Sequence, residues 1–244
     1  MKLTTYTKYL TELLRLTMKI NVIATGSSGN LYEILDNTGN SMLIEAGVPR
    51  SEYMKHKEGV KAPEMCVISH NHSDHSKCAG EFEAIIPVYK WQEESISQNF
   101  KAAGFKLKHG EGFSMAFIIK FLADNDYLFF GTDFEFSEHY DELYETLKHY
   151  KVNKFLIECN YNVFLFHKAD EIQRVGCIRH LSDAGVVRFI RMISPENPKI
   201  ITIHGSNRLS GDTYTKKYIS SKLLTSKVSV AVGASGKTKN LFTF

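Results

Sequence analysis

The sequence lacks the features that mark a membrane protein, an exported protein or a nucleic-acid-binding tail. Its 244 residues include only four cysteines, and none forms a CxxC pair, which argues against a disulfide framework or a zinc knuckle. No apolar run is long enough to span a bilayer, and no signal-peptide pattern is present. The net charge of +3 is too small to require a nucleic-acid partner. We therefore expect a cytoplasmic protein with reduced thiols.

Internal repeats, low-complexity segments and obvious linkers are also missing, while 43% of the residues are hydrophobic. This composition predicts a single globular domain over residues 18–244. Residues 1–17, MKLTTYTKYLTELLRLT, form a leader or N-terminal extension whose leucines could make a docking face. Alternatively, translation naturally begins at Met18, and we favour this interpretation because a clean strand pattern starts at Lys19.

Buried strand patterns alternate with helical patterns along the rest of the chain, which indicates an α/β protein. The sequence predicts strands at "INVIAT", "MCVIS", "AIIPVY", "FSMAFIIKF", "DYLFFGTD", "KFLIECN" and "KIITIH", and a hairpin around "DNTGN". Helices are expected at 51–57 with Ser51 as N-cap, and at 77–82, 92–102, 139–150 and 182–193. The tail from Gly211 onward has no clear pattern.

Polar residues follow several of these predicted strands. His70 comes directly after "MCVIS", Asp133 ends "DYLFFGTD", Glu158 ends "KFLIE" and His204 ends "KIITIH". The carboxyl ends of buried strands are where a layered α/β protein builds its sites. Four separate stretches of the chain thus point to one site.

The stretch "SHNHSDHSK" (Ser69 to Lys77) places three histidines and an aspartate within six residues. Imidazole and carboxylate groups are good ligands for zinc and other divalent cations. A pair of cations needs about seven such groups, one of them a bridging carboxylate. The chain supplies a matching set: His70, His72, Asp74, His75, His109, Asp133 and His204. We expect two divalent metal ions, zinc or manganese.

"HNHSDH" resembles the HxHxDH motif of the metallo-β-lactamase fold, and in particular its phosphodiesterase branch. "ATGSSGN" and "MLIEAG" resemble YycJ/WalJ-like proteins, and "RHLSDAG" with "IITIHGSNRLS" resembles the C-terminal motifs of ribonuclease Z proteins. The resemblance extends from Met18 to about Arg208. It implies an αββα fold, in which two mixed β-sheets are sandwiched between helices.

The resemblance also implies two ligand sets that share Asp133: His70, His72 and His109 on one ion, and Asp74, His75 and His204 on the other. His109 precedes Gly-Glu where relatives often have His-Asp, so His139 and His149 stay open as alternatives. Glu45 stands where the family usually has the aspartate of "DAG". That group supports the site from behind, so the longer side chain does not argue against metal binding.

Catalytic roles follow from the same resemblance. Asp74 would orient or deprotonate the nucleophilic water while binding one metal ion. His180, in "RHLSD", matches the histidine thought to protonate the leaving group in ribonuclease Z relatives, and Glu158 would hold its imidazole in position. Arg208 could grip a phosphate oxygen. The competing interpretations are an N-cap neighbour without chemistry for His180 and an ordinary surface arginine for Arg208.

The compact chain resembles the phage anti-Pycsar phosphodiesterases, which hydrolyse cyclic mononucleotides such as cCMP and cUMP. This resemblance implies a small-molecule phosphodiester substrate and a homodimer. Independently of it, Tyr214, Tyr218 and Phe242 in the tail could supply an aromatic lid that stacks on a base. The alternative is a nuclease acting on DNA or RNA, like the YycJ/WalJ or ribonuclease Z proteins. A metal-binding scaffold without turnover is the third interpretation.

Overall fold

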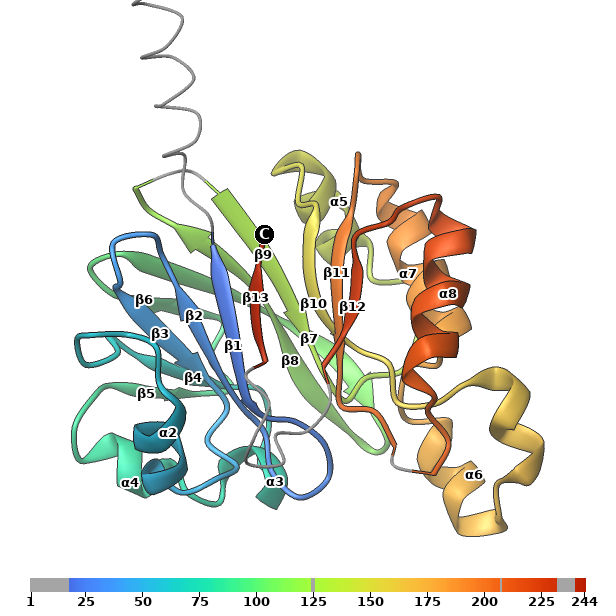
Figure 1. Ribbon diagram of the computed structural model, residues 1–244, viewed down its shortest axis with the longest axis horizontal. Helices are drawn as coiled ribbons and strands as arrows, with labels where there is room; N and C mark the ends of the chain where they lie inside the picture. The colour runs from blue at the N-terminus through green and yellow to red at the C-terminus, as the bar shows by residue number, and fades with distance from the viewer. Residues whose placement is uncertain (1–17, 124–125, 207, 232–239) are drawn as a thin grey trace, which may run out of the picture.

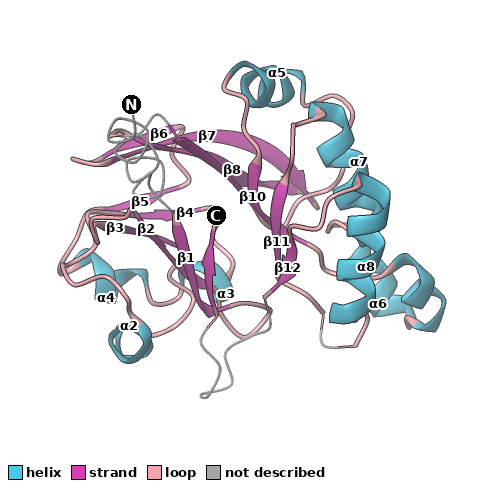
Figure 2. Cartoon of the chain, turned by 45° about the horizontal axis from the view of Figure 1, so that its top comes forward, coloured by secondary structure: helices cyan, strands magenta, loops and turns pink. Residues whose placement is uncertain are grey.

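Two mixed β-sheets face each other in this protein, and helices cover their outer faces (Figures 1 and 2). The computed structural model describes residues 18–123, 126–206, 208–231 and 240–244. The leader predicted at residues 1–17 lies outside them. None of the described helices is both long and apolar enough to cross a bilayer.

Within the described residues, the first sheet contains six strands in the order β13-β1-β2-β3-β4-β5. Their bounds are β1 Lys19–Ala24, β2 Leu31–Leu35, β3 Ser41–Ile44, β4 Cys66–Ile68, β5 Val88–Lys90 and β13 Leu241–Thr243. Strands β3, β4 and β5 are parallel, and the other pairs are antiparallel. The hairpin predicted around "DNTGN" is β2–β3 and is confirmed.

The second sheet has seven described strands in the order β12-β11-β10-β9-β8-β7-β6. Their bounds are β6 Glu94–Ile96, β7 Phe100–His109, β8 Gly112–Phe121, β9 Asp126–Gly131, β10 Lys154–Glu158, β11 Lys199–Ile203 and β12 Val228–Val230. Strands β9 to β12 run parallel, so their carboxyl ends lie at one edge of the sheet.

Most of the described helices lie on the two outer faces (Figure 2), whereas α3 lies at the ends of the first sheet's strands (Figure 1). On the side of the first sheet are α2 Arg50–His56, α3 Ser73–Ser76 and α4 Ala79–Glu83. On the side of the second sheet are α5 Asp141–His149, α6 Glu171–Cys177, α7 Asp183–Ile193 and α8 Asp212–Leu223, with a 3₁₀ helix at Val163–Lys168. Helix α6 lies at the lower right corner of Figure 1, beyond the edge of the sheet.

Three hydrophobic clusters fill the spaces between these layers, because the inner strands are apolar on both faces. Met42 and Ile44 of β3 enter the cluster between the sheets, whereas Leu43 packs in the cluster beneath α2 and α4. On the other side, Leu156 of β10 faces the first sheet and Phe155 faces the outer helices. This alternation produces the αββα arrangement that the sequence predicts.

The prediction of a helix at 92–102 is wrong. This segment contains β6 and the start of β7, and Ala102 pairs with Ile119 in the hairpin that the two ten-residue strands β7 and β8 form. Long-range strand pairing here overrides a local helical pattern. Ser51 is not an N-cap either, since α2 begins at Arg50 after Pro49. Ser182, in contrast, caps α7 by accepting a 3.0 Å hydrogen bond from the Gly185 amide.

A candidate metal centre between the two sheets

The predicted ligands converge from both sheets. The first sheet supplies the histidine-rich stretch, because His70 follows β4 by two residues and α3 carries Asp74 and His75. The second sheet supplies His109, the last residue of β7, together with the residues that follow β9 and β11, Asp133 and His204. The structure therefore brings together side chains that are up to 134 residues apart in the sequence (204 minus 70).

Among the residues that the structure describes, three groups of side chains could each hold a metal ion, with ligand atoms within 4.8 Å of one another in each group. They are His70, His72, His109 and Asp133; Asp74, His75 and His204; and Asp133, Glu158, His180 and His204. The first two groups match the two predicted ligand sets. The third adds His180 and Glu158, which the sequence assigns to other roles.

The Asp133 carboxylate, a member of the first group, lies between the histidines of that group and those of the second. Its Oδ2 atom is 3.6 Å from Nε2 of both His70 and His75, and 3.8 Å from Nε2 of His109. Its Oδ1 atom is 3.3 Å from Nδ1 of His204. One carboxylate thus faces imidazoles of both groups, which is the position that a bridging ligand requires.

The buried nitrogen of His70 tests whether this donor set suits a cation. Its Nδ1 atom lies 2.9 Å from the Ser69 hydroxyl, whereas its Nε2 atom is buried and has no hydrogen-bond partner. A buried polar atom without a partner is costly and calls for an explanation. A divalent cation accepts the lone pair of such a nitrogen, so the residues present fit a metal.

Other side chains hold the ligands from behind. Glu45 Oε1 lies 3.4 Å from His75 Nδ1, and Glu45 Oε2 accepts a 3.3 Å hydrogen bond from the Ser69 amide. The Arg179 carbonyl is 3.1 Å from His109 Nδ1. Contacts of this kind fix the ring orientation of metal-binding histidines. Glu45 therefore occupies the supporting position expected for it.

Sequence reasoning missed Asn30, the last residue of "ATGSSGN", and assigned it no role at the site. The Asn30 side-chain amide is 3.2 Å from His75 Nε2 and 3.3 Å from Asp74 Oδ2, and its oxygen accepts a hydrogen bond from the Gly26 amide. The loop thus carries a polar side chain into the centre. An asparagine at the end of a glycine-rich turn gives no local sign of that role.

Burial and opposing charges set the protonation of the site. Burial lowers the pKa of His70 to about 3. Burial alone would raise the pKa of the Asp133 carboxyl, but His204 and His75 hold it well below its usual range. Asp74 behaves in the same way beside His204 and His75. Ionised carboxylates beside a neutral His70 are the protonation states in which these groups bind a metal.

His180 and Glu158 form a pair at the edge of this centre. His180 Nδ1 lies 2.9 Å from Glu158 Oε2, and the other oxygen of Glu158 accepts hydrogen bonds from the amides of Phe134 and Leu181. Burial lowers the pKa of His180, but the Glu158 carboxylate outweighs it and raises the pKa to about 9. The imidazole is thereby held in one orientation, 3.9 Å from Asp133 Oδ1.

His139 and His149, the alternatives to His109, are exposed on the second-sheet side and belong to none of the ligand groups found among the described residues. Arg208 is exposed and lines a cavity of about 290 Å³ with His204 and Asn160. It therefore lies beside the centre, where the sequence predicts a phosphate-binding residue.

The prediction that Phe242 belongs to an aromatic lid over the site is wrong. This residue lies in β13, packs against the core between the sheets, and lines a cavity with Lys199, the first residue of β11. His204 follows the opposite end of that strand. Tyr214 and Tyr218 stack on each other along α8, with ring centres 6.1 Å apart.

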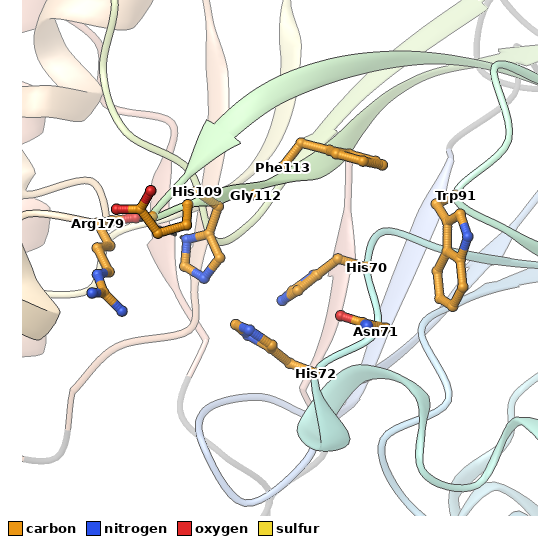
Figure 3. A pocket seen from close by; sticks show the side chains of 10 residues that line it. His70, Asn71, His72, Trp91, His109, Gly112, Phe113 and Arg179 are labelled. Carbon is orange, nitrogen blue, oxygen red and sulfur yellow. Dashed lines mark hydrogen bonds between the residues drawn. The ribbon is translucent and has the colours of Figure 1, made fainter.

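A larger cavity, of about 510 Å³, opens directly over the first ligand group. His70, His72 and His109 form its centre in Figure 3, with Trp91 and Phe113 on one side and Arg179 on the other. Its volume is within the range of small-molecule sites, roughly 300–1,000 Å³.

Neither a protein-family model nor a curated protein sequence matches the chain. Solved structures do resemble it. The metallo-β-lactamase fold protein YhfI from Bacillus subtilis superposes with a TM-score of 0.69 at 13% identity, over 93% of this chain and 100% of that one.

Human tRNase Z, short form, gives a TM-score of 0.58 at 12% identity, over 78% of this chain and 94% of that one. A diphosphatase from the PhnP family gives 0.62 at 13% identity, over 94% and 99% of the two chains. At these identities the likeness establishes the fold.

Proposed function

We propose that this chain, which has the metallo-β-lactamase fold, is a phosphodiesterase that depends on two divalent metal ions and hydrolyses small cyclic nucleotides. The residues that would hold the ions are His70, His72, Asp74, His75, His109, Asp133 and His204. The ions would be zinc or manganese, since imidazole and carboxylate ligands accept both.

One observation carries the proposal: the Asp133 carboxylate faces histidines of both ligand groups, at 3.3 to 3.8 Å. A shared carboxylate at this position suits two neighbouring cations better than one isolated cation. When bound, such a pair lowers the pKa of water and neutralises the charge on a phosphoryl group.

The protein's own residues would then position the reactants. Asp74 is the partly exposed carboxylate of the centre, with a side chain 18% exposed, and it would orient the attacking water. His180 would protonate the leaving oxygen, with Glu158 fixing its ring through the 2.9 Å contact. Arg208 would bind a phosphate oxygen from the neighbouring cavity.

The fold alone does not choose a substrate. Two of the similar structures belong to proteins named as a tRNase and a diphosphatase, and His180 offers the proton that an alkoxide leaving group needs. A small substrate is favoured because α5 is the one helix between Asp133 and Glu158, with no room for an added nucleic-acid-binding domain. The likeness to human tRNase Z keeps a nuclease as the second candidate.

The test is to incubate the purified, metal-loaded protein with cCMP or cUMP and, separately, with 5′-labelled single-stranded DNA and RNA. We expect hydrolysis of the cyclic nucleotides to their monophosphates. Cleavage of the oligonucleotides alone would establish the nuclease instead. If neither substrate is cleaved while metal analysis finds two bound ions, the protein is a scaffold and the proposal is wrong.

A matched control variant distinguishes loss of activity through the metal centre from loss through any substitution. His139→Ala removes an exposed histidine outside the ligand groups and should leave turnover unchanged, whereas Asp133→Ala should abolish it.

The homodimer and the role against Pycsar immunity belong to the same proposal and are supported by the sequence resemblance. Light scattering of the metal-loaded protein tests the dimer.

A further inference from the structure

Two exposed aromatic side chains stand at the mouth of the larger cavity. Trp91 is 38% exposed and Phe113 is 42% exposed, although both are large and apolar. They line the same cavity as His70, His72 and His109 (Figure 3). Flat apolar rings beside a polar centre are a common feature of sites that bind aromatic ligands.

Backbone hydrogen bonds hold the main chain at or near both aromatic residues next to the strand end that precedes His70. The Trp91 amide donates a 2.8 Å hydrogen bond to the carbonyl of Ile68, two residues before His70. The amide of Met115, two residues after Phe113, donates a 3.0 Å bond to the carbonyl of Ser69. Neither aromatic residue is therefore on a free loop, and each is held next to the strand end that carries His70.

The backbone of Trp91 is in an unfavourable conformation. Its φ is +44°, in the left-handed region that glycine or asparagine adopts more readily. Such a conformation is strained, and strained residues cluster at ligand-binding and active sites. A tryptophan that is both strained and over one-third exposed contributes little to the core, which favours a role in binding.

Arg179 lies on the opposite side of the cavity (Figure 3). The lining also includes one acidic residue, Glu111, and within the described residues no ion pair joins it to the Arg179 guanidinium. Arg179 passes next to Gly110, since a Cβ at position 110 would lie 3.4 Å from Arg179 Cδ and Nε, an ordinary contact distance. The cavity thus has an aromatic side and a cationic side, with the metal ligands between them.

We infer that this cavity is a nucleobase subsite, in which the base of a nucleotide stacks on Trp91 and Phe113 while Arg179 pairs with its phosphate. The inference deepens the proposed function and rests on it, because it names the part of the substrate that the cavity recognises. It also assigns the stacking role to residues other than Tyr214, Tyr218 and Phe242.

The chain contains a single tryptophan and twelve tyrosines, so fluorescence of the full-length, metal-loaded protein that is excited beyond the tyrosine absorption band reports on Trp91 alone. We would titrate it with CMP and with ribose 5-phosphate, which carries the same phosphate and sugar but no base. CMP should quench the emission saturably, whereas ribose 5-phosphate should bind more weakly and leave the emission unchanged. Equal affinities for the two ligands would overturn the inference.

Calorimetry on variants supplies the second measurement. Trp91→Ala should weaken CMP binding by roughly 5- to 150-fold, as expected for loss of one base–aromatic stack, with ribose 5-phosphate binding unchanged. Trp91→Phe should restore most of the affinity. The control is Phe164→Ala, which should change neither value. It removes an aromatic ring that is 61% exposed and that lines none of the three cavities described above. CMP binding that is unaffected by Trp91→Ala would refute the subsite.

Failure of the subsite and failure of the proposed function are distinguishable. Hydrolysis of bis(p-nitrophenyl) phosphate by the wild-type protein measures phosphodiesterase activity without a nucleobase. If that activity is present but CMP has no advantage over ribose 5-phosphate, only the subsite is wrong. If CMP stacks on Trp91 but no phosphodiester is hydrolysed, the subsite stands and the catalytic assignment is wrong.

Discussion

Gly47 packs directly against the backbone of Asp74. A Cβ atom at position 47 would lie 1.7 Å from the Asp74 carbonyl oxygen and 2.4 Å from its carbonyl carbon. The same carbonyl accepts a 2.7 Å hydrogen bond from the Asn30 amide, and the amide of Ala46 donates to His75. The ligand loop is therefore locked onto the end of the first sheet by backbone contacts that leave no space for a side chain.

Gly47→Ala should accordingly displace Asp74 and His75, because backbone atoms cannot yield as a flexible side chain can. We expect a destabilisation of a few kcal/mol and loss of at least one bound ion, measured by urea unfolding and by metal analysis. Gly80→Ala is the matched control, since a Cβ there meets nothing within 4 Å. A Gly47→Ala variant with full metal content would contradict this account of the loop.

Glu45→Gln should weaken metal binding without removing a ligand. The carboxylate lies 3.4 Å from His75 Nδ1 and supports that ring from the side away from Asp133. Loss of such a supporting carboxylate typically costs 10- to 100-fold in metal affinity, which competition with a metal chelator can measure. Glu52→Gln, on exposed α2, serves as the control. Unchanged affinity in Glu45→Gln would show that the contact has no influence on the metal.

His180→Ala should lower the rate of phosphodiester hydrolysis by about 10²- to 10⁴-fold, the usual contribution of a general acid. Metal content should stay at the wild-type level, since His180 Nδ1 is hydrogen-bonded to Glu158. Loss of an ion in this variant would instead assign His180 to the third ligand group. An unchanged rate would remove His180 from the mechanism.

Asp183 provides a prediction for pH and stability. It begins α7, is fully buried, and its Oδ2 atom has no hydrogen-bond partner. Burial raises its pKa above the usual value of about 4. The protonated carboxyl therefore stabilises the fold at pH values below the unfolded pKa, and this contribution is lost as the pH rises through the raised folded pKa.

Asp183→Asn keeps the shape and removes the charge. It should be more stable than the wild type at pH 7, and the difference in unfolding free energy should shrink as the pH falls towards 4. Urea unfolding at several pH values checks this. A difference that grows on acidification would mean that the ionised carboxylate is favoured in the folded protein.

The fold and the ligand groups could be predicted because each depends on a pattern within a short stretch of sequence. The cluster from His70 to His75 lies within six residues, and Asp133 and His204 each end an apolar stretch that reads as a buried strand. The sequence favours His109 over His139 and His149 only through its place just ahead of the strands "FSMAFIIKF" and "DYLFFGTD", as the family order requires. Its position in space depends on where β7 ends. The structure shows that β7 ends at His109, beside Asp133.

No short sequence pattern identified the residues that line the larger cavity. Trp91 comes near His70 because β5 pairs with β4, and Phe113 does so because β8 runs past Ser69. Both relationships are between segments distant in sequence, and the first lies next to the segment that was wrongly expected to be helical. Arg179 adjoins a predicted catalytic residue, yet its position opposite the aromatic rings depends on how the two sheets pack.

Because the ligands come from opposite sheets, cations bound at this centre would link the two sheets and stabilise their packing. His70 and its neighbours come from one sheet, and Asp133 and His204 from the other. An ion that binds only the folded chain stabilises it by about 2.7 kcal/mol at a concentration one hundred times its dissociation constant. The resistance of the whole protein to heat and proteolysis would thus follow the supply of free metal around it.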